Sequence, residues 1–166
     1  MSASQKKLPL LQIVTLVFLT DRLTKFLTAF FFKEGEGFPV VPGFFHITRV
    51  SNHGAAFGIL KDQEKALLLV SILCVIALGV YLLRQRTHSE PSRFGHIPWA
   101  LVLAGAAGNL YDRVRFGYVV DLLDFRIWPV FNIADSAITV GAFLVAAELF
   151  LKPRRPGKSP DAPDPL

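Results

Sequence analysis

The chain has 166 residues, of which 52% are hydrophobic and only 19% are charged, and its mean hydropathy is +0.43. Soluble globular domains carry about 25% charged residues, so this composition indicates a membrane protein that crosses the bilayer several times. The formal charge of +5 does not indicate nucleic-acid binding, because the basic residues lie at the ends of apolar segments and not on one solvated face. A single cysteine, Cys74, excludes an internal disulfide, and the histidine spacing does not indicate a metal site.

Four apolar segments have about the 20 residues that a membrane-spanning helix needs. In chain order they are residues 8–32, 66–83, 94–110 and 133–151. Asp21 and Lys25 interrupt the first segment, and no small-residue cleavage site follows it, so it is not a cleaved signal peptide. We therefore predict an all-α polytopic membrane protein with four transmembrane helices in one domain, residues 1–152. The Pro-, Lys- and Asp-rich residues 153–166 are predicted to form a disordered cytoplasmic tail.

The distribution of Lys and Arg predicts the orientation of these helices. Nine lie in the amino-terminal tail, the loop between the second and third segments, and the carboxy-terminal tail, against four in the first loop and three in the last. By the positive-inside rule, both termini then lie in the cytoplasm. The long first loop, residues 33–65, lies outside, and the alternating apolar residues after Gly43 predict a small extracytoplasmic β-element there. Its aromatic residues, such as Phe38 and Phe44, are expected to contact the bilayer surface.

In this orientation the polar residues in and beside the helices gather at the outer interface. An ionisable residue inside a span costs about 2.5–3.5 kcal/mol on insertion scales, so each is a functional candidate. A structural interpretation also exists for several of them. Asp21 and Lys25 are spaced to pair on one helix face, and Asn132 is placed to cap the last helix with Asp135 in its first turn. Gly105 belongs to a stripe of small residues that predicts a close helix contact.

Asp121 and Asp135 are the best candidates for chemistry. Two carboxylates at a partly desolvated interface do not both ionise readily, so one keeps a proton and the other activates water. They lie on separate segments, which a short outer connection brings together. Four polar residues are positioned to hold a peptide backbone or a lipid head group: Asn52, Asn109, Arg113 and Asn132.

Two other functional classes stay open on the residues alone. A Ser/Lys membrane hydrolase would use Ser136 or Ser51 with Lys25. A transporter or proton relay would also hold buried carboxylates, but it predicts polar groups that continue through the inner half of the spans. Residues 8–20 and 136–147 are almost without such groups, which favours a site on the outer side.

Five motifs, in this order, resemble the bacterial lipoprotein signal peptidase (signal peptidase II) family. They are Asp21-Arg-Leu-Thr-Lys25, Ser51-Asn-His-Gly-Ala-Ala-Phe-Gly58, Gly108-Asn-Leu-Tyr-Asp-Arg113, Val119-Val-Asp121 and Phe131-Asn-Ile-Ala-Asp-Ser-Ala-Ile138. The resemblance implies an aspartic endopeptidase of the bacterial inner membrane that removes the signal peptide from prolipoproteins, just before the diacylglyceryl-modified cysteine. Its active site would face the periplasmic side. We expect a monomer among membrane lipids, with no cofactor and no metal.

The resemblance also assigns residues. It implies that Asp121 and Asp135 form the catalytic dyad. The family's other motif positions around the site fall on Asp21, Lys25, Asn52, Gly54, Asn109, Asp112, Arg113, Asn132 and Ala134. A membrane-surface helix would accompany the outer β-element.

The chain departs from the family pattern at two places. Arg22 stands where the family usually has Gln, so no role is predicted for it. The family's Val-Val-Asp-Phe is replaced by Val119-Val120-Asp121-Leu122, with a second aspartate, Asp124, before Phe125. We assign Asp121, which follows Val-Val and keeps the close spacing from Asp112, and Asp124 stays open as the alternative.

Overall fold

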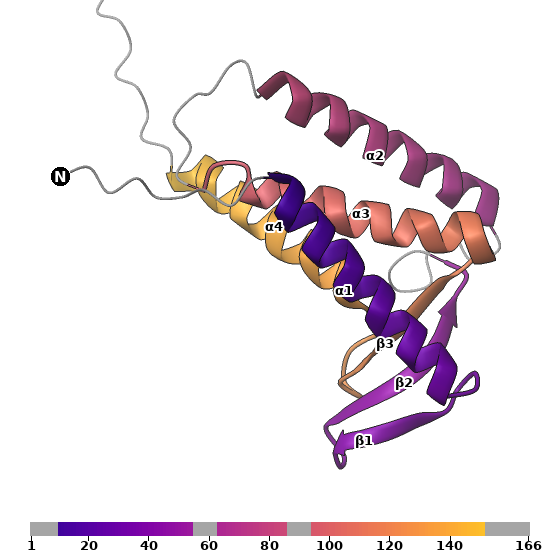
Figure 1. The fold of residues 1–166 in the computed structure, drawn as a ribbon. Helices are drawn as coiled ribbons and strands as arrows, with labels where there is room; N and C mark the ends of the chain where they lie inside the picture. The colour runs from indigo at the N-terminus through magenta and orange to yellow at the C-terminus, as the bar shows by residue number, and fades with distance from the viewer. Residues whose placement is uncertain (1–9, 55–62, 86–93, 152–166) are drawn as a thin grey trace, which may run out of the picture.

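The computed structural model describes residues 10–54, 63–85 and 94–151 (Figure 1). Its helices are α1 (Leu10–Phe31), α2 (Glu64–Gln85), α3 (Ile97–Phe116) and α4 (Ile133–Leu151). Its strands are β1 (Gly37–Val41), β2 (Phe45–Asn52) and β3 (Val119–Asp124). The prediction of a mostly helical chain with a small β-element after the first helix is therefore confirmed. The predicted tail and the predicted membrane-surface helix fall on residues outside these ranges.

Helix α3 is the centre of the helical part, because α1, α2 and α4 all pack against it. In Figure 1, α1 and α4 lie on one side of α3 and α2 lies on the other. Small residues allow the close approach of α3 and α4, as the sequence predicts. A Cβ atom added to Gly141 would lie 2.6 Å from the carbonyl oxygen of Pro98, and one added to Gly105 would collide with the carbonyl oxygen of Ala134.

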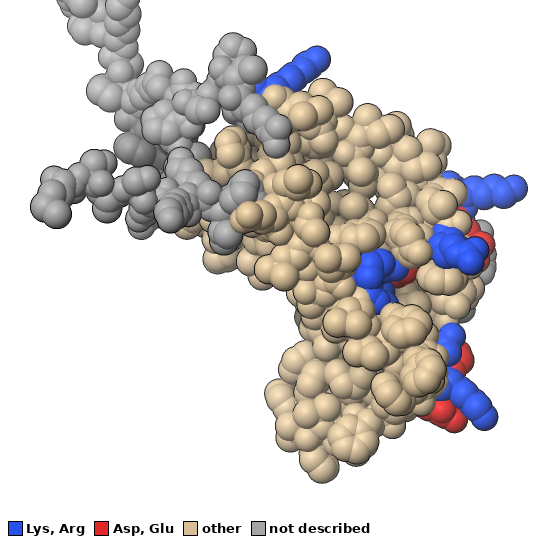
Figure 2. Space-filling model, viewed as in Figure 1, with Lys and Arg blue, Asp and Glu red and all other residues tan. Residues whose placement is uncertain are grey.

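The described residues bury polar side chains and expose apolar ones, which reverses the pattern of a soluble protein. Asp21, Asp112 and Asn132 are all 0% exposed, whereas Leu16 is 68% and Phe143 is 71% exposed. Figure 2 shows a broad uncharged surface over much of the helices, with most charged side chains toward the end of the helices where the sheet lies. A surface of this kind is suited to contact with lipid.

Within the described part of the chain, two helices are long and apolar enough to cross a membrane, over Glu64–Arg84 and Ile133–Leu151. Helices α1 and α3 have similar lengths, 22 and 20 residues, but carry charged residues within their length, among them Asp21, Lys25 and Asp112. The number of spans and the location of the termini therefore stay predictions.

The three strands form one antiparallel sheet in the order β1-β2-β3. Asp121 lies in the short connection between α3 and α4, as expected, and within it belongs to β3, where it is paired with Val50 of β2. The chain enters β3 through Gly117, whose φ of 83° ends α3 in a left-handed cap. The sheet therefore holds Asp121 against one end of the helices.

The helix contact at Gly105 makes a testable prediction. Gly105→Ala should lower the free energy of unfolding by about 1–3 kcal/mol, because the new methyl group would press on the backbone of Ala134 and on Ile138. Thermal unfolding in detergent measures this. The matched control is Gly79→Ala in α2, where no atom lies within 4 Å, and which should be neutral or stabilising by up to about 1 kcal/mol. Equal losses in both variants would contradict the packing described.

Candidate active site

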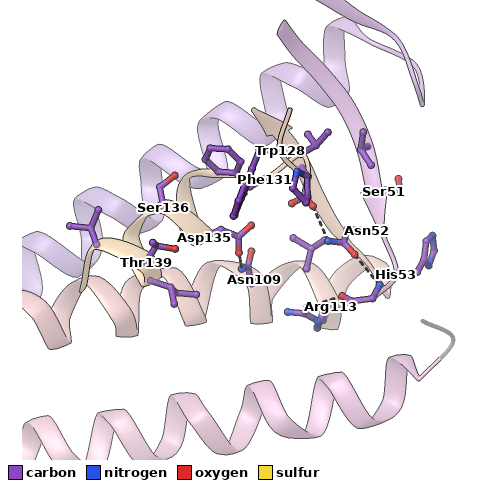
Figure 3. A pocket seen from close by; sticks show the side chains of 18 residues that line it. Ser51, Asn52, His53, Asn109, Arg113, Trp128, Phe131, Asp135, Ser136 and Thr139 are labelled. Carbon is purple, nitrogen blue, oxygen red and sulfur yellow. Dashed lines mark hydrogen bonds between the residues drawn. The ribbon is translucent and has the colours of Figure 1, made fainter. Parts of the chain in front are cut away.

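A pocket of about 1090 Å³ lies where the sheet meets α3 and α4. One part of its wall is polar and comes from four separate elements: Asn52, Asn109, Arg113, Asp121 and Asp135. The rest is mainly apolar, with Trp128 and Phe131 from the loop before α4 and Ile138 from α4 itself. Figure 3 shows Asp135 facing Asn109 beside this apolar wall. The predicted aspartate pair therefore lines one pocket.

Asp121 reaches the pocket from β3 and is 2% exposed. Its Oδ2 accepts a hydrogen bond from Asn52 Nδ2 at 2.9 Å, and its Oδ1 accepts one from Asn132 Nδ2 at 2.7 Å. Burial, and then the negative charge of Asp135, raise the pKa of Asp121 to about 7 despite these hydrogen bonds. This carboxyl can therefore hold or release a proton near neutral pH.

Asp135 lies in the first turn of α4. Its Oδ1 accepts a hydrogen bond from Asn109 Nδ2 at 2.7 Å, and its Oδ2 accepts one from the backbone N–H of Asn132 at 3.3 Å. In return, Asn132 Oδ1 accepts the backbone N–H of Asp135 at 2.8 Å. This is a reciprocal capping arrangement, as the predicted N-cap requires. Asn132 thus caps α4 with its oxygen while its amide nitrogen binds Asp121, so it serves the helix and the pocket together.

Behind the pocket lies a buried group of four charges, Asp21, Arg22, Lys25 and Asp112, here called the charge cluster. Lys25 Nζ lies 3.1 Å from Asp21 Oδ2 and 2.7 Å from Asp112 Oδ2, which confirms the predicted i, i+4 pair. Arg22 forms ion pairs with both carboxylates as well. Two negative and two positive charges balance within the cluster, which is what burial of ions requires.

The charge cluster is connected to the pocket through backbone amides. Asp21 Oδ1 accepts the N–H of Ala134 at 3.0 Å, and Asp112 Oδ2 accepts the N–H of Val120 at 3.3 Å. These two residues directly precede Asp135 and Asp121. Lys25 adds a third link, because its Nζ donates to Asn109 Oδ1 at 3.1 Å.

Gly54 and Arg113 lie at the edge of the pocket. Asn52 Oδ1 accepts the N–H of Gly54 at 2.9 Å, which fixes the bend after β2. Arg113 Nη2 donates to the carbonyl oxygen of Gly54 at 3.4 Å, and its Nη1 donates to Ser71 Oγ at 3.5 Å. With these two, every residue at the family's motif positions lines the pocket or belongs to the contacts that support it.

Asp124, the alternative to Asp121, is held in a different way. Its carboxylate accepts hydrogen bonds from Arg126, at 2.8 Å from the backbone nitrogen and 2.9 Å from Nη1, and one from Thr48 Oγ1 at 3.4 Å. Partial burial opposes the shift, but the hydrogen bonds and charge of Arg126 lower the pKa of Asp124 below its ordinary value. Asp124 is not among the pocket-lining residues. The geometry therefore favours Asp121.

The Ser/Lys hypothesis has no support in the contacts. Ser136 Oγ donates to the carbonyl oxygen of Asn132 at 2.9 Å, and Ser51 Oγ donates to Glu34 at 2.6 Å. Lys25 is engaged by the charge cluster and by Asn109.

Sequence reasoning missed the position of Arg22 and the apolar wall of the pocket. A signal for Arg22 was available, since two buried aspartates and one lysine leave a negative charge that a neighbouring arginine can balance. Trp128 and Phe131 gave no such signal, because an aromatic side chain in a loop does not by itself indicate a site.

We predict that Lys25→Met destabilises the protein by about 3–5 kcal/mol, because it leaves two buried carboxylates with one cation. Thermal unfolding in detergent tests this against Lys65→Met, at an exposed position of α2, where a change within about 0.5 kcal/mol is expected. If both variants melted at the same temperature, the charge cluster would not be the stabilising contact described.

A family model described as signal peptidase (SPase) II matches residues 13–151 of the chain. The lipoprotein signal peptidase of Moorella thermoacetica is 42% identical over 155 residues, which cover 92% of this chain and 100% of the relative. That of Syntrophotalea carbinolica is 46% identical over 136 residues, with coverage of 80% and 84%. The structure of a bacterial membrane enzyme, determined by the in meso method at 2.3 Å resolution, superposes with a TM-score of 0.75 at 33% identity, covering 90% of this chain and 94% of that one.

Proposed function

The chain belongs to the signal peptidase II family, and we propose that it uses Asp121 and Asp135 to remove the signal peptide from prolipoproteins. The reaction is hydrolysis of a peptide bond by an aspartic endopeptidase, in line with the lipoprotein signal peptidases to which the chain is similar. The fold agrees with an enzyme that works in a membrane, and so does the burial of polar side chains beneath an apolar surface.

One observation carries the assignment of the dyad. Asp121 and Asp135 line the same pocket, come from separate elements, and are linked by amides that touch both of them. Asn132 binds Asp121 directly and donates to Asn109 at 3.3 Å, which in turn donates to Asp135. Such a pair can share one proton, as catalytic carboxylate dyads do.

In the proposed mechanism Asp121 carries the shared proton and Asp135 carries the charge. Asp135 accepts a proton from a water molecule as the water oxygen attacks the carbonyl carbon of the peptide bond, and Asp121 donates its proton to the carbonyl oxygen. Breakdown of the resulting tetrahedral diol breaks the carbon–nitrogen bond. One proton then moves to the leaving nitrogen and one returns to the pair, which restores the starting state.

The substrate in this proposal is a prolipoprotein with a diacylglyceryl-modified cysteine, cut just before that cysteine. The apolar wall around Phe131 and Ile138 suits a hydrophobic signal peptide, and Val140, which is 50% exposed, continues that wall along α4. The substrate would enter laterally from the membrane lipids. Arg113 lies at the edge, where it can hold a backbone carbonyl or a lipid head group.

We further propose that the protein is a monomer whose four helices all span the bacterial inner membrane. Both termini then lie in the cytoplasm, and the pocket lies on the periplasmic side. The helices have 19 to 22 residues, about the length that a hydrocarbon core requires. The positive-inside rule supports this orientation. It places the sheet and the charge cluster at the outer face.

The decisive test of the dyad is cleavage of a lipid-modified precursor in detergent. Asp121→Asn and Asp135→Asn should each lower the rate by at least about 10³-fold, because either change removes a proton donor or acceptor of the reaction. Asp124→Asn is the matched control and should keep most of the activity. Activity retained in either dyad variant, or lost only in Asp124→Asn, would reject the assignment.

The same assay with an unmodified precursor tests the proposed substrate. If the lipid is recognised, the unmodified form should be cut more slowly, so equal rates for the two forms would contradict that part of the proposal.

The pH dependence follows from the raised pKa of Asp121. Because the pKa is raised to about 7, the proton is present below that pH, and the cleavage rate should fall as pH rises through about 7. A carboxyl with a raised pKa stabilises the fold fully below its unfolded value, near 4, and that contribution is lost as pH rises through about 7. The melting temperature should therefore fall from about pH 6 to pH 8, and less so in Asp121→Asn. A rate that stays constant to about pH 9 would contradict this protonation.

A further inference from the structure

We infer that Arg22 is a positioning residue for both proposed catalytic aspartates, because its guanidinium joins the two carboxylates that bind the backbone beside them. The inference rests on the proposed function only where it calls Asp121 and Asp135 catalytic. The contacts that carry it belong to the charge cluster.

The guanidinium of Arg22 connects two helices. Its Nη2 donates to Asp21 Oδ2 at 2.6 Å on its own helix α1, and its Nη1 donates to Asp112 Oδ1 on α3. The side chain is 17% exposed, and both carboxylates are almost completely buried. A planar fork of N–H donors can bind two carboxylates in a fixed geometry, whereas an ammonium group acts as a point charge.

Each of these carboxylates holds one element of the pocket. Asp21 binds Arg22 through Oδ2 and the N–H of Ala134 through Oδ1. Asp112 binds Arg22 through Oδ1 and the N–H of Val120 through Oδ2. Because Arg22 holds the oxygen opposite each of these backbone contacts, it restricts the rotation of both carboxylates together with Lys25. It thereby sets the backbone position immediately before Asp135 and before Asp121.

Arg22 also supplies the second positive charge of the cluster. Without it, the two buried carboxylates would share Lys25 alone, and a net negative charge would remain behind the dyad. An uncompensated buried charge is costly and tends to draw in water or rearrange its neighbours. The two carboxylates would then no longer hold the backbone amides of Ala134 and Val120 in fixed positions.

Two aromatic rings cover the guanidinium. Its Cζ lies 4.7 Å from the ring centroid of Tyr111 and 5.8 Å from that of Phe18, and the two rings meet edge to face. Cation–π contacts of this kind stabilise a partly desolvated cation. The two rings and the two carboxylates together restrict the orientation of the arginine, which a positioning role requires.

The test compares Arg22→Gln, which removes the charge, with Arg22→Lys, which keeps the charge but not the fork. Arg115→Gln is the matched control, because Arg115 is an exposed residue near the end of α3. Cleavage of the lipid-modified precursor gives kcat and KM for each variant. Amide hydrogen exchange in detergent reports the contacts at Val120 and Ala134 without reference to activity.

For Arg22→Gln we expect kcat to fall about tenfold with KM within about twofold, since a small displacement of reacting groups slows the chemical step. The amides of Val120 and Ala134 should exchange about tenfold faster, while those of the β1–β2 hairpin keep their protection. Arg22→Lys should restore part of kcat, and Arg115→Gln should match the wild type.

Two results would overturn the inference. One is an unchanged kcat with unchanged exchange at Val120 and Ala134. The other is a lower melting temperature with unchanged kcat per folded enzyme and unchanged exchange, which would make Arg22 a stabilising residue only. A wild-type protein that cuts no prolipoprotein would instead refute the proposed function. In that case, hydrogen exchange at the amides of Val120 and Ala134 in Arg22→Gln would by itself decide whether Arg22 positions the backbone.

Discussion

The pairing of buried carboxylates is the constraint on which the rest of this structure depends. Four aspartates lie within one end of an apolar helical bundle, where an unpaired carboxylate costs several kcal/mol. Asp21 and Asp112 meet this constraint with two cations, Lys25 and Arg22. The helices α1 and α3 that carry them are thereby locked together, and the backbone amides they bind place the strand and the helix that form the pocket.

Asp121 and Asp135 are held differently. Their side-chain partners are the amides of asparagines, and among the described residues neither forms an ion pair. Amide donors fix the position of a carboxylate without neutralising it, whereas a cation at hydrogen-bond distance would strongly favour the charged form. The protein thus separates the two tasks of a buried carboxylate. Those paired with cations hold backbone amides beside the pocket, and those paired with amides are the ones for which we propose proton transfer.

The sequence predicts this site well wherever the determinants are local. The capping residue Asn132, the pair of Asp21 with Lys25, and the hairpin after the first helix all follow from patterns along the chain, and the structure contains each of them. Contacts between residues far apart in the sequence were harder to predict from it. Strand β3 is buried on both faces, so it lacks the alternation of a half-exposed strand, and its partner β2 lies about 70 residues earlier. The ion pair of Arg22 with Asp112 spans 90 residues and leaves no local pattern.

Asn132 gives the fold a property that its separate contacts do not show. The same side chain closes the first turn of α4 and binds Asp121, while its backbone N–H binds Asp135. Fraying of that single turn would therefore remove one hydrogen bond from each carboxylate at once, and would leave Asp121 with Asn52 and Asp135 with Asn109. Winding of the start of α4 is therefore coupled to completing the hydrogen bonds around both carboxylates.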